Sequence, residues 1–229
     1  TQFKYLGHSN LLGVEPTGTY IFHKKHNINV VNDYLNLESS KKIYSKYGKA
    51  KVITTTNVFA HTNKLGDFIN GIKKIIKKDG IFIIENHYLL DVIRKNQFDT
   101  FYHEHLRTYS LKSLIKLMKF YDFYVYKAIT SERYGGNIQV HFTLKKVKPT
   151  STVNKILKIE KDFGLDNPKT YIRFNSNLEK IKIEFFEYLN KNKSKFIIGK
   201  AFPARASIII HYFSFMKDYL QFIVEQPTS

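Results

Sequence analysis

The chain has 229 residues, of which 43% are apolar and 15% aromatic, enough for one large or two modest folded units with a hydrophobic core. It contains no cysteine, which excludes disulfides and thiolate zinc sites within this segment. Its 37 Lys and Arg residues outnumber its 19 Asp and Glu residues and give a net charge of +18, so nucleic acid has to be considered as a partner.

Short apolar runs alternate with helical patterns over most of the chain. Strands are indicated where β-branched and aromatic residues cluster, and helices where apolar residues recur at helical spacing. In chain order we expect strands at 11–16 (short and buried), 28–35 and 50–59, a helix at 63–78, a strand at 80–89, a helix at 110–123, and an antiparallel strand pair at 123–132 and 137–146. This order predicts an α/β fold whose mainly parallel sheet has an antiparallel edge.

Beyond residue 150 the pattern changes to long, charged helices. We expect helices at 151–163 and 175–192, a strand at 195–201, a helix at 203–215 and a strand at 220–226. Residues 1–149 are therefore assigned to a first α/β domain, and residues 150–229 to a smaller C-terminal α/β domain.

The excess lysines are spread along the chain rather than gathered in a block. Lys73, Lys74, Lys77 and Lys78 alternate with isoleucines, as on the solvent face of an amphipathic helix. We therefore expect no nucleic-acid partner, and an anionic small substrate would use the positive potential equally well. No apolar run reaches the roughly 18 residues of a membrane span and no secretion signal opens the chain, so we expect a cytoplasmic protein without membrane contact. A monomer is the working expectation, and the sequence does not determine the oligomeric state.

Polar side chains follow the predicted strands, where ligands bind in open α/β sheets. Glu15 ends the first strand, and an acid in that place either grips the hydroxyls of a ribose or is a solvated turn residue. Asn57 and His61 follow the third strand, and residues 85–87 (Glu, Asn and His) follow the fourth. We expect these groups to converge on one edge of the sheet.

A Tyr-His-Glu-His motif occupies Tyr102, His103, Glu104 and His105. In an extended run Tyr102 and Glu104 would share one side and the two histidines the other, so we expect a turn that re-aims them. His-x-His is also a metal spacing, and histidines in loops are often simple surface residues. Because no HExxH helix and no third clustered ligand accompanies the motif, we expect no metal site.

Five blocks occur in order between residues 5 and 146: GVEP, TTNVFAH, IIENHYL, FDTFYHEHLRTYSL and YGGNIQV. Together they resemble the S-adenosylmethionine-dependent sugar C-methyltransferases, which methylate C3 of a nucleotide-linked 4-keto sugar. The tail, PARASIIIHY and FIVEQP, is similar to the C-terminal segment of that family. The resemblance implies a class I methyltransferase (Rossmann-like) sheet, S-adenosylmethionine as cofactor, and a nucleotide-linked keto sugar as substrate.

Methylation beside a ketone needs a base for the carbon-bound proton and a donor for the developing enolate oxygen. The resemblance places the base at His105, whose neutral imidazole suits the task at working pH. It places Tyr102 and Glu104 where they would bond the sugar and steady the enolate or the base.

The resemblance also assigns cofactor positions. Glu15 would hold the ribose, and Asn57 and His61 would border the methionine part or the substrate. Relatives carry an N-terminal zinc-binding domain and a first strand with a glycine-rich cofactor loop, and neither is present in these 229 residues. We therefore expect a fragment, or a gene truncated at both ends, with an incomplete methyltransferase sheet.

Substrate positions are implied in the block that usually reads HGGSLR in the family. Here Tyr134, Asn137 and Gln139 replace His, Ser and Arg, so we expect a different substrate choice. The two glycines between them either lie near the active site or only form a hairpin turn. Lys200 and Arg205, the latter at the place of a family lysine, are candidate phosphate partners or surface charges.

Three other functions stay open. The chain could be a non-catalytic remnant that binds nucleotide sugars, or a basic nucleic-acid-binding module. Methylation of oxygen or nitrogen uses the same fold and needs no enolate.

Overall fold

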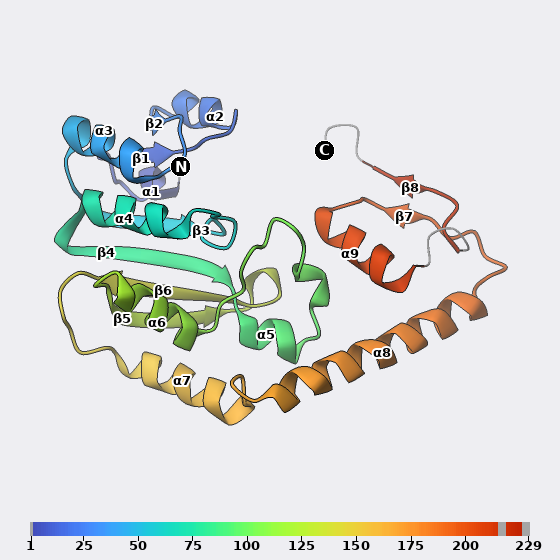
Figure 1. Ribbon diagram of the computed structural model, residues 1–229. Helices are drawn as coiled ribbons and strands as arrows, with labels where there is room; N and C mark the ends of the chain where they lie inside the picture. The colour runs from blue at the N-terminus through green and yellow to red at the C-terminus, as the bar shows by residue number, and fades with distance from the viewer. Residues whose placement is uncertain (1, 215–218, 226–229) are drawn as a thin grey trace.

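A computed structural model describes residues 2–214 and 219–225. Figure 1 shows a sheet-containing unit connected by one long helix, α8, to a smaller C-terminal unit. The expected helix end at residue 215 and strand end at residue 226, with the family-like residues Gln226 and Pro227, lie outside the described part.

The sheet-containing unit is built from short elements in alternating order. They are α1 (Gln2–Tyr5), β1 (Leu12–Val14), α2 (Tyr20–Lys25), β2 (Asn29–Val31), α3 (Leu37–Tyr47), β3 (Ala50–Thr56), α4 (Leu65–Ile75), β4 (Ile76–His87), α5 (Leu89–Arg94), the 3₁₀ turn η1 (Phe98–Thr100), α6 (Leu111–Phe120), β5 (Tyr124–Ser131), the 3₁₀ turn η2 (Arg133–Gly135) and β6 (Asn137–Thr143).

Four strands form the main sheet in the order β3-β4-β6-β5. β4 is parallel to β3 and antiparallel to β6, and β5 is antiparallel to β6. The predicted α/β fold with an antiparallel edge is thereby confirmed, but the main sheet is mixed rather than mainly parallel, because two of its three ladders are antiparallel. The later strand, β6, inserts next to β4 and leaves β5 outermost.

β1 and β2 form a parallel pair of their own, with Leu12 opposite Asn29. Within the described residues no ladder joins this pair to β3. The prediction of a buried strand over 11–16 is wrong, because β1 has three residues and all of them are partly exposed. A two-stranded sheet covers too little of its own surface to bury them.

The core lies between the main sheet and the helices that pack on it. Its fully buried members include Phe59, Ile69, Ile72, Phe82, Ile84, Val140 and Phe142. α4 presents apolar residues to β4, but it ends at Ile75 rather than at 78. Lys77 and Lys78 therefore lie in the exposed first part of β4, not on the helix as predicted.

α3 is a helix that the apolar pattern does not predict. Most of its residues are polar and only Ser39, Ser40 and Ile43 are buried. Asn36 caps it by accepting from the Ser39 N–H at 2.8 Å. Gly71 of α4 lets α3 approach closely, because a Cβ there would lie 2.7 Å from the Asn36 carbonyl oxygen and the Ser40 hydroxyl.

The C-terminal region contains α7 (Ser151–Phe163), α8 (Pro168–Lys191), β7 (Gly199–Lys200), α9 (Ala204–Phe213) and β8 (Ile223–Val224). α8 begins seven residues earlier than predicted, since Asn167 caps it and Pro168 suits its first turn. β7 and β8 pair in parallel but have only two residues each, shorter than the predicted strands. No helix in residues 2–214 and 219–225 is long and apolar enough to cross a membrane.

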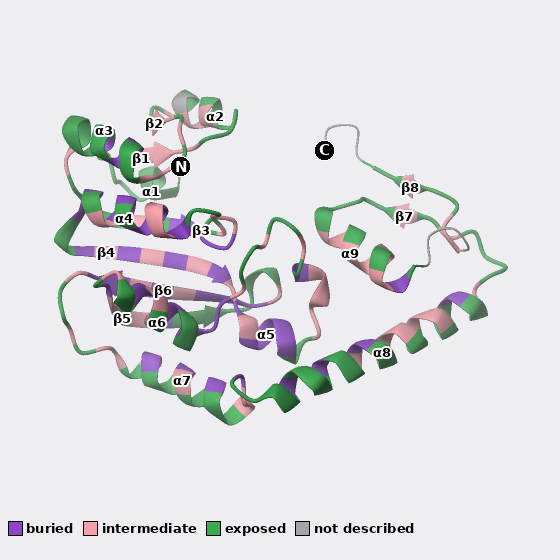
Figure 2. Cartoon of the chain, in the orientation of Figure 1, coloured by how far each residue is buried: buried purple, intermediate pink, exposed green. Residues whose placement is uncertain are grey.

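Both α7 and α8 carry buried as well as exposed residues (Figure 2). α7 packs against β5 and α6 of the first unit, and its Glu160 is only 4% exposed. The Glu160 carboxylate accepts from the backbone N–H groups of Leu111 and Lys112, at 2.5 and 3.1 Å, and from the Tyr88 hydroxyl at 3.0 Å. A residue of the C-terminal region thus caps the buried N-terminus of α6.

Candidate functional site

The Tyr-His-Glu-His motif forms a turn between η1 and α6. The backbone N–H of His105 donates to the carbonyl of Tyr102 at 2.9 Å. Tyr102 and His105 are half-buried, whereas the side chains of His103 and Glu104 are 84% and 53% exposed. The turn therefore directs Tyr102 and His105 into the protein and His103 and Glu104 to solvent. An extended segment could not do this, because its alternate residues would share a side.

His105 is held through both ring nitrogens. Nδ1 lies 2.9 Å from the carbonyl oxygen of Thr100, and Nε2 lies 3.3 Å from the hydroxyl of Tyr102. A carbonyl oxygen can only accept, so in the neutral ring Nδ1 carries the proton and Nε2 keeps its lone pair. Burial lowers the pKa of His105, against the opposing Thr100 bond. The geometry leaves Nε2 as a proton acceptor.

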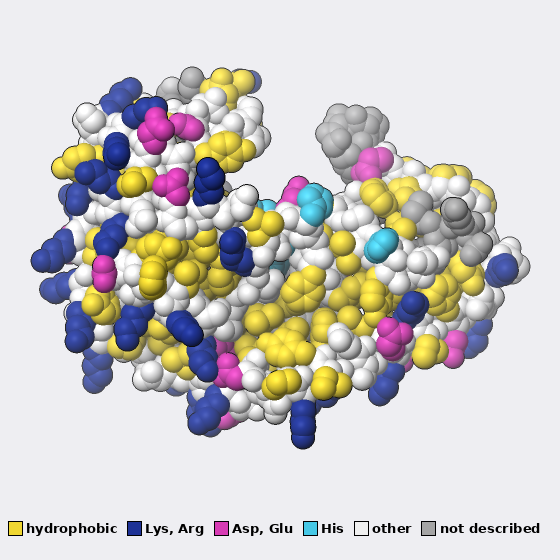
Figure 3. Space-filling model, viewed as in Figure 1, with side chains coloured by type: hydrophobic (Ala, Val, Ile, Leu, Met, Phe, Trp, Pro, Cys, Tyr) yellow, Lys and Arg dark blue, Asp and Glu magenta, His cyan; other side chains and the backbone are white. Residues whose placement is uncertain are grey.

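Two further histidines surround His105. The ring centroid of His61 lies 4.8 Å from that of His105, and those of His87 and Tyr102 lie 5.2 and 4.3 Å from it. Figure 3 shows histidines on the floor of a hollow between the part of the molecule that carries α2 and the part that carries β8. The described residues contain no three His, Asp or Glu side chains arranged to ligate one metal ion.

His87 ends β4 and belongs to this cluster. Its Nδ1 is buried, and no hydrogen-bond partner for it occurs among the described residues. Burial, with the nearby charge of His105 when protonated, lowers the pKa of His87 from 6.5 to about 4. His87 is therefore a neutral polar group in the site at physiological pH.

This pKa predicts a pH-dependent loss of stability. Between pH 6.5 and 4 the unfolded chain takes up a proton at His87 that the folded protein does not, so stability falls as the pH falls. Relative to His87→Gln, the wild type should lose about 2 kcal/mol of unfolding free energy over that range, less than the full shift because the ring is partly exposed. Urea unfolding at pH 7.5 and 4.5 measures it.

His103→Gln is the matched control, because His103 is 84% exposed in the adjoining loop. Its unfolding free energy should follow the wild type at both pH values. Equal pH dependence of His87→Gln and the wild type would contradict the buried, neutral state of His87.

Glu85 organises the polar groups on the neighbouring strand. Its carboxylate accepts from the side-chain amides of Asn137 and Gln139, at 3.3 and 3.1 Å, and Arg133 lies 3.7 Å away. Asn137 is fully buried. Two of the three residues that depart from the family pattern, Asn137 and Gln139, thus bind an acid of the protein. The substrate contact predicted for Asn137 stays a prediction.

Tyr134 stands at the rim of the same cluster. Its ring centroid lies 6.5 Å from that of His87, its side chain is exposed, and the Arg133 guanidinium lies over its ring at 4.8 Å. The glycines after it build the turn: Gly136 has a φ of +137°, and a Cβ there would collide with Asp91. Tyr134 is thus a neighbour of His87, and the substrate contact predicted for it stays a prediction.

Arg205 reaches the first unit from α9. Its Nε and Nη2 each donate to one carboxylate oxygen of Asp99, both at 2.8 Å. Nothing in the sequence singles out Asp99 or Thr100 beyond their place in the FDT that precedes the motif. Lys200 is exposed in β7, so of the two candidate phosphate partners Arg205 is the one connected to the motif.

Glu15 lies at the carboxyl end of β1. Its backbone N–H donates to the carbonyl of Val31 at 3.0 Å, and one carboxylate oxygen accepts from both the N–H and the hydroxyl of Thr17. These bonds lower the pKa of Glu15. An ionised carboxylate fixed at a strand end fits the hydroxyls of a ribose, although Glu15 lies on a different sheet from the histidine cluster.

Asn57 follows β3 in a left-handed conformation with a φ of +54°. Its N–H continues the ladder to the Glu85 carbonyl at 2.9 Å. Its side-chain oxygen and both polar atoms of the Asn86 side chain are buried, and no partner for them occurs among the described residues. Buried polar atoms of this kind need a ligand or water, so this edge fits a polar cofactor.

Comparisons with known proteins identify the family of this chain. Residues 3–128 match the family described as a methyltransferase domain, and residues 132–229 match the C-methyltransferase C-terminal domain. The C-methyltransferase NovU of Streptomyces niveus is 27% identical over 179 residues, which cover 76% of this chain. The match spans only 42% of the length of that relative.

The similar solved structures include two methyltransferases that are distant in sequence. An S-adenosylmethionine-dependent methyltransferase from Anabaena variabilis has a TM-score of 0.47 and 14% identity, over 63% of this chain and 73% of the other. One from Thermotoga maritima has a TM-score of 0.44 and 15% identity, over 59% and 73%.

Proposed function

Because the chain belongs to the methyltransferase-domain family, which more than half of its length matches, we propose that it takes part in transferring a methyl group from S-adenosylmethionine to a carbon beside the ketone of a nucleotide-linked keto sugar. S-adenosylmethionine is the methyl donor of this family. The observation that carries the proposal is His105, whose Nδ1 is committed to a carbonyl and whose Nε2 is left as a proton acceptor.

In the proposed reaction His105 removes the proton from the carbon to be methylated. As Nε2 takes up that proton, the imidazolium forms while Nδ1–H stays bonded to the Thr100 carbonyl, which favours the charged ring. Tyr102 is a phenol whose pKa is raised, mainly by burial, so it stays protonated and can donate to the enolate oxygen. The cofactor supplies the electrophilic methyl group.

The remaining residues would bind and orient. Asn57 and His61 would border the cofactor methionine or the sugar, and Tyr134 and Asn137 would contact the substrate. Glu104 is exposed at the lip of the motif, where it would hydrogen-bond a sugar hydroxyl. The positive charge excess of the chain suits the diphosphate of a nucleotide sugar.

The test is to incubate the protein in D₂O with a nucleotide-linked 4-keto sugar, with and without S-adenosylmethionine. Deuterium uptake at the carbon beside the ketone, followed by methylation of that carbon, is the expected result. Methylation of an oxygen or nitrogen without exchange would favour the rival chemistry. Binding of the sugar nucleotide with neither reaction would favour a non-catalytic role.

Glu15→Gln should weaken binding of S-adenosylhomocysteine by about 10- to 100-fold, because a charge-assisted pair of hydrogen bonds to the ribose is lost. Isothermal titration calorimetry measures the affinity. The control is Glu38→Gln, on α3, whose side chain is 81% exposed and whose loss should leave the affinity unchanged. Equal affinities of Glu15→Gln and wild type would remove Glu15 from the cofactor site.

A further inference from the structure

The C-terminal helix α9 is joined to η1 by a bidentate ion pair between Asp99 and Arg205, here called the Asp99–Arg205 pair. Both of its hydrogen bonds are 2.8 Å long, and the Asp99 and Arg205 side chains are only 20% and 35% exposed. A planar guanidinium that meets a carboxylate through two parallel bonds fixes orientation as well as distance. The two residues are 106 positions apart in the chain, so the pair joins the two units directly.

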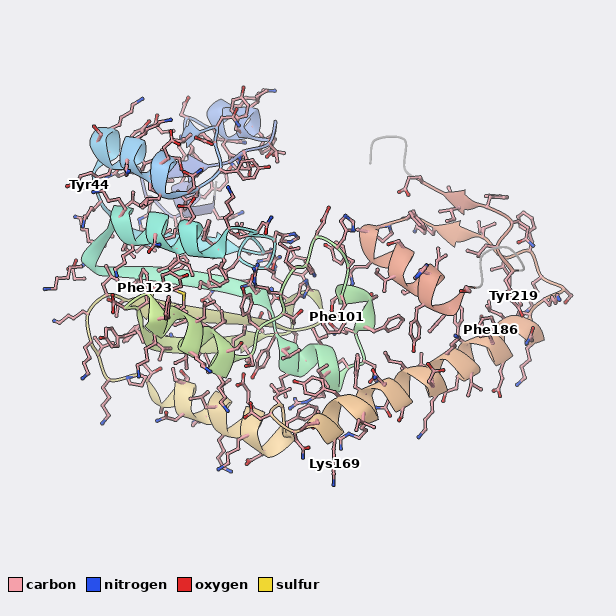
Figure 4. All side chains as sticks on the ribbon, viewed as in Figure 1. Tyr44, Phe101, Phe123, Lys169, Phe186 and Tyr219 are labelled. Atoms are coloured by element: carbon pink, nitrogen blue, oxygen red, sulfur yellow. The ribbon has the colours of Figure 1, made fainter. Side chains whose placement is uncertain are left out.

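Apolar contacts beside the pair hold η1 against the same helix. The ring of Phe98 lies 5.1 Å from that of Tyr212 and 5.6 Å from that of Phe213. Next to the motif, Phe101 faces α8, with its ring 6.4 Å from that of Phe174 (Figure 4). The segment that leads into the Tyr-His-Glu-His turn is therefore positioned by the C-terminal region, and by more than one kind of contact.

Thr100 converts this positioning into a constraint on His105. Thr100 follows Asp99 directly, is 1% exposed, and bonds through its hydroxyl to the Gln97 carbonyl at 2.8 Å. Its own carbonyl oxygen receives Nδ1–H of His105 at 2.9 Å. The direction of that carbonyl depends on the backbone of η1, and hence on where Asp99 is held.

We propose that Arg205 is a positioning residue that acts through Asp99 and the Thr100 carbonyl to keep His105 in the Nδ1–H tautomer with Nε2 facing the site. This use of Arg205 differs from the phosphate contact predicted from the sequence, since Nε and Nη2 both serve Asp99. It rests on the proposed role of His105 as the base for its functional meaning. The tautomer itself is a property of the folded chain alone.

The test is nuclear magnetic resonance of the histidine side chains in ¹⁵N-labelled protein at pH 7.5, where long-range ¹H–¹⁵N spectra separate the two tautomers. In the wild type His105 should be in the Nδ1–H form. In Arg205→Gln that form should lose its dominance, and His105 should show the mixture of tautomers seen for the exposed His103 in the same spectrum. Asp99→Asn, which keeps one acceptor, should give the same shift to a smaller extent.

Two variants separate positioning from a general loss of structure. Lys73, near the C-terminal end of α4, forms an ion pair of 2.7 Å with Asp122 on the protein surface. Lys73→Gln breaks this pair and should leave the tautomer of His105 unchanged. Asp99→Arg combined with Arg205→Asp reverses the Asp99–Arg205 pair and should restore the Nδ1–H form. An unchanged His105 tautomer in Arg205→Gln and in Asp99→Asn would overturn the proposal, whatever the exchange assay shows about His105 as a base.

Discussion

Replacing His105 with glutamine should lower the rate of deuterium exchange at the carbon beside the ketone by about 10³-fold, within the range that general bases contribute. Glutamine matches the reach of the ring and can still bond the Thr100 carbonyl, but it has no lone pair basic enough to take a carbon-bound proton. Tyr102 would remain available to the ketone oxygen. The loss should therefore fall on proton removal and leave sugar binding nearly intact.

The exchange rate is measured by mass spectrometry of the nucleotide sugar after timed incubation in D₂O. His103→Gln is the control, since His103 is two residues away but points to solvent, and it should exchange at the wild-type rate. Exchange by His105→Gln at a rate close to the wild type would exclude His105 as the base. Loss of exchange in both variants would indicate that the whole turn has been disturbed.

Glu160→Ala should lower the free energy of unfolding by about 3 kcal/mol, one of the largest losses open to a single polar side chain in this protein. The change leaves two buried donors, the Leu111 N–H and the Tyr88 hydroxyl, and the partly buried Lys112 N–H without an acceptor. Burial raises the pKa of Glu160, which shows that burying the charged carboxylate has a cost. The substitution removes this cost, so the loss of unfolding free energy is smaller than three full desolvation penalties. Urea unfolding at pH 7 measures it.

Two substitutions on α7 frame this result. Asp162→Ala breaks an exposed pair with Lys158 on the same helix and should cost less than about 0.5 kcal/mol. Glu160→Gln keeps an acceptor for Leu111 and Tyr88 but turns a donor toward the Lys112 N–H, and should cost about 1 kcal/mol. If Glu160→Ala and Asp162→Ala were equally stable, the cap on α6 would have no role in stability.

The main sheet could be predicted because its signals are local. β-branched runs mark β3 to β6, and Ser110 marks the start of α6 with a capping box that the structure shows in full. α3 was not predicted because it buries small polar residues against Gly71. A helix of this kind shows no apolar periodicity in its sequence. The burial of the strand at 11–16 was overestimated because burial depends on neighbours, and within the described residues β1 pairs with no strand other than β2.

The site divides along the same line. The sequence order places His61, His87 and the motif on three separate segments, and alternation requires a turn at the motif, but neither gives the ring-to-ring distances. The Asp99–Arg205 pair could not be predicted from the sequence because it joins residues 106 positions apart. Hydrophobic periodicity indicates local structure and gives no information about such a contact. The burial that lowers the pKa of His87 likewise depends on packing from elements distant in the chain.

The cap that Glu160 places on α6 has a consequence for the order in which the protein folds during synthesis. The sheet is complete when residue 143 has emerged, yet the N–H groups of Leu111 and Lys112 at the start of α6 lack their acceptor, Glu160, until α7 follows. The core of the sheet-containing unit can therefore close only after α7, which belongs to the C-terminal region, has been synthesised. A boundary drawn at residue 150 divides the sequence by composition, but the last step of folding the first unit belongs to the helix beyond that boundary.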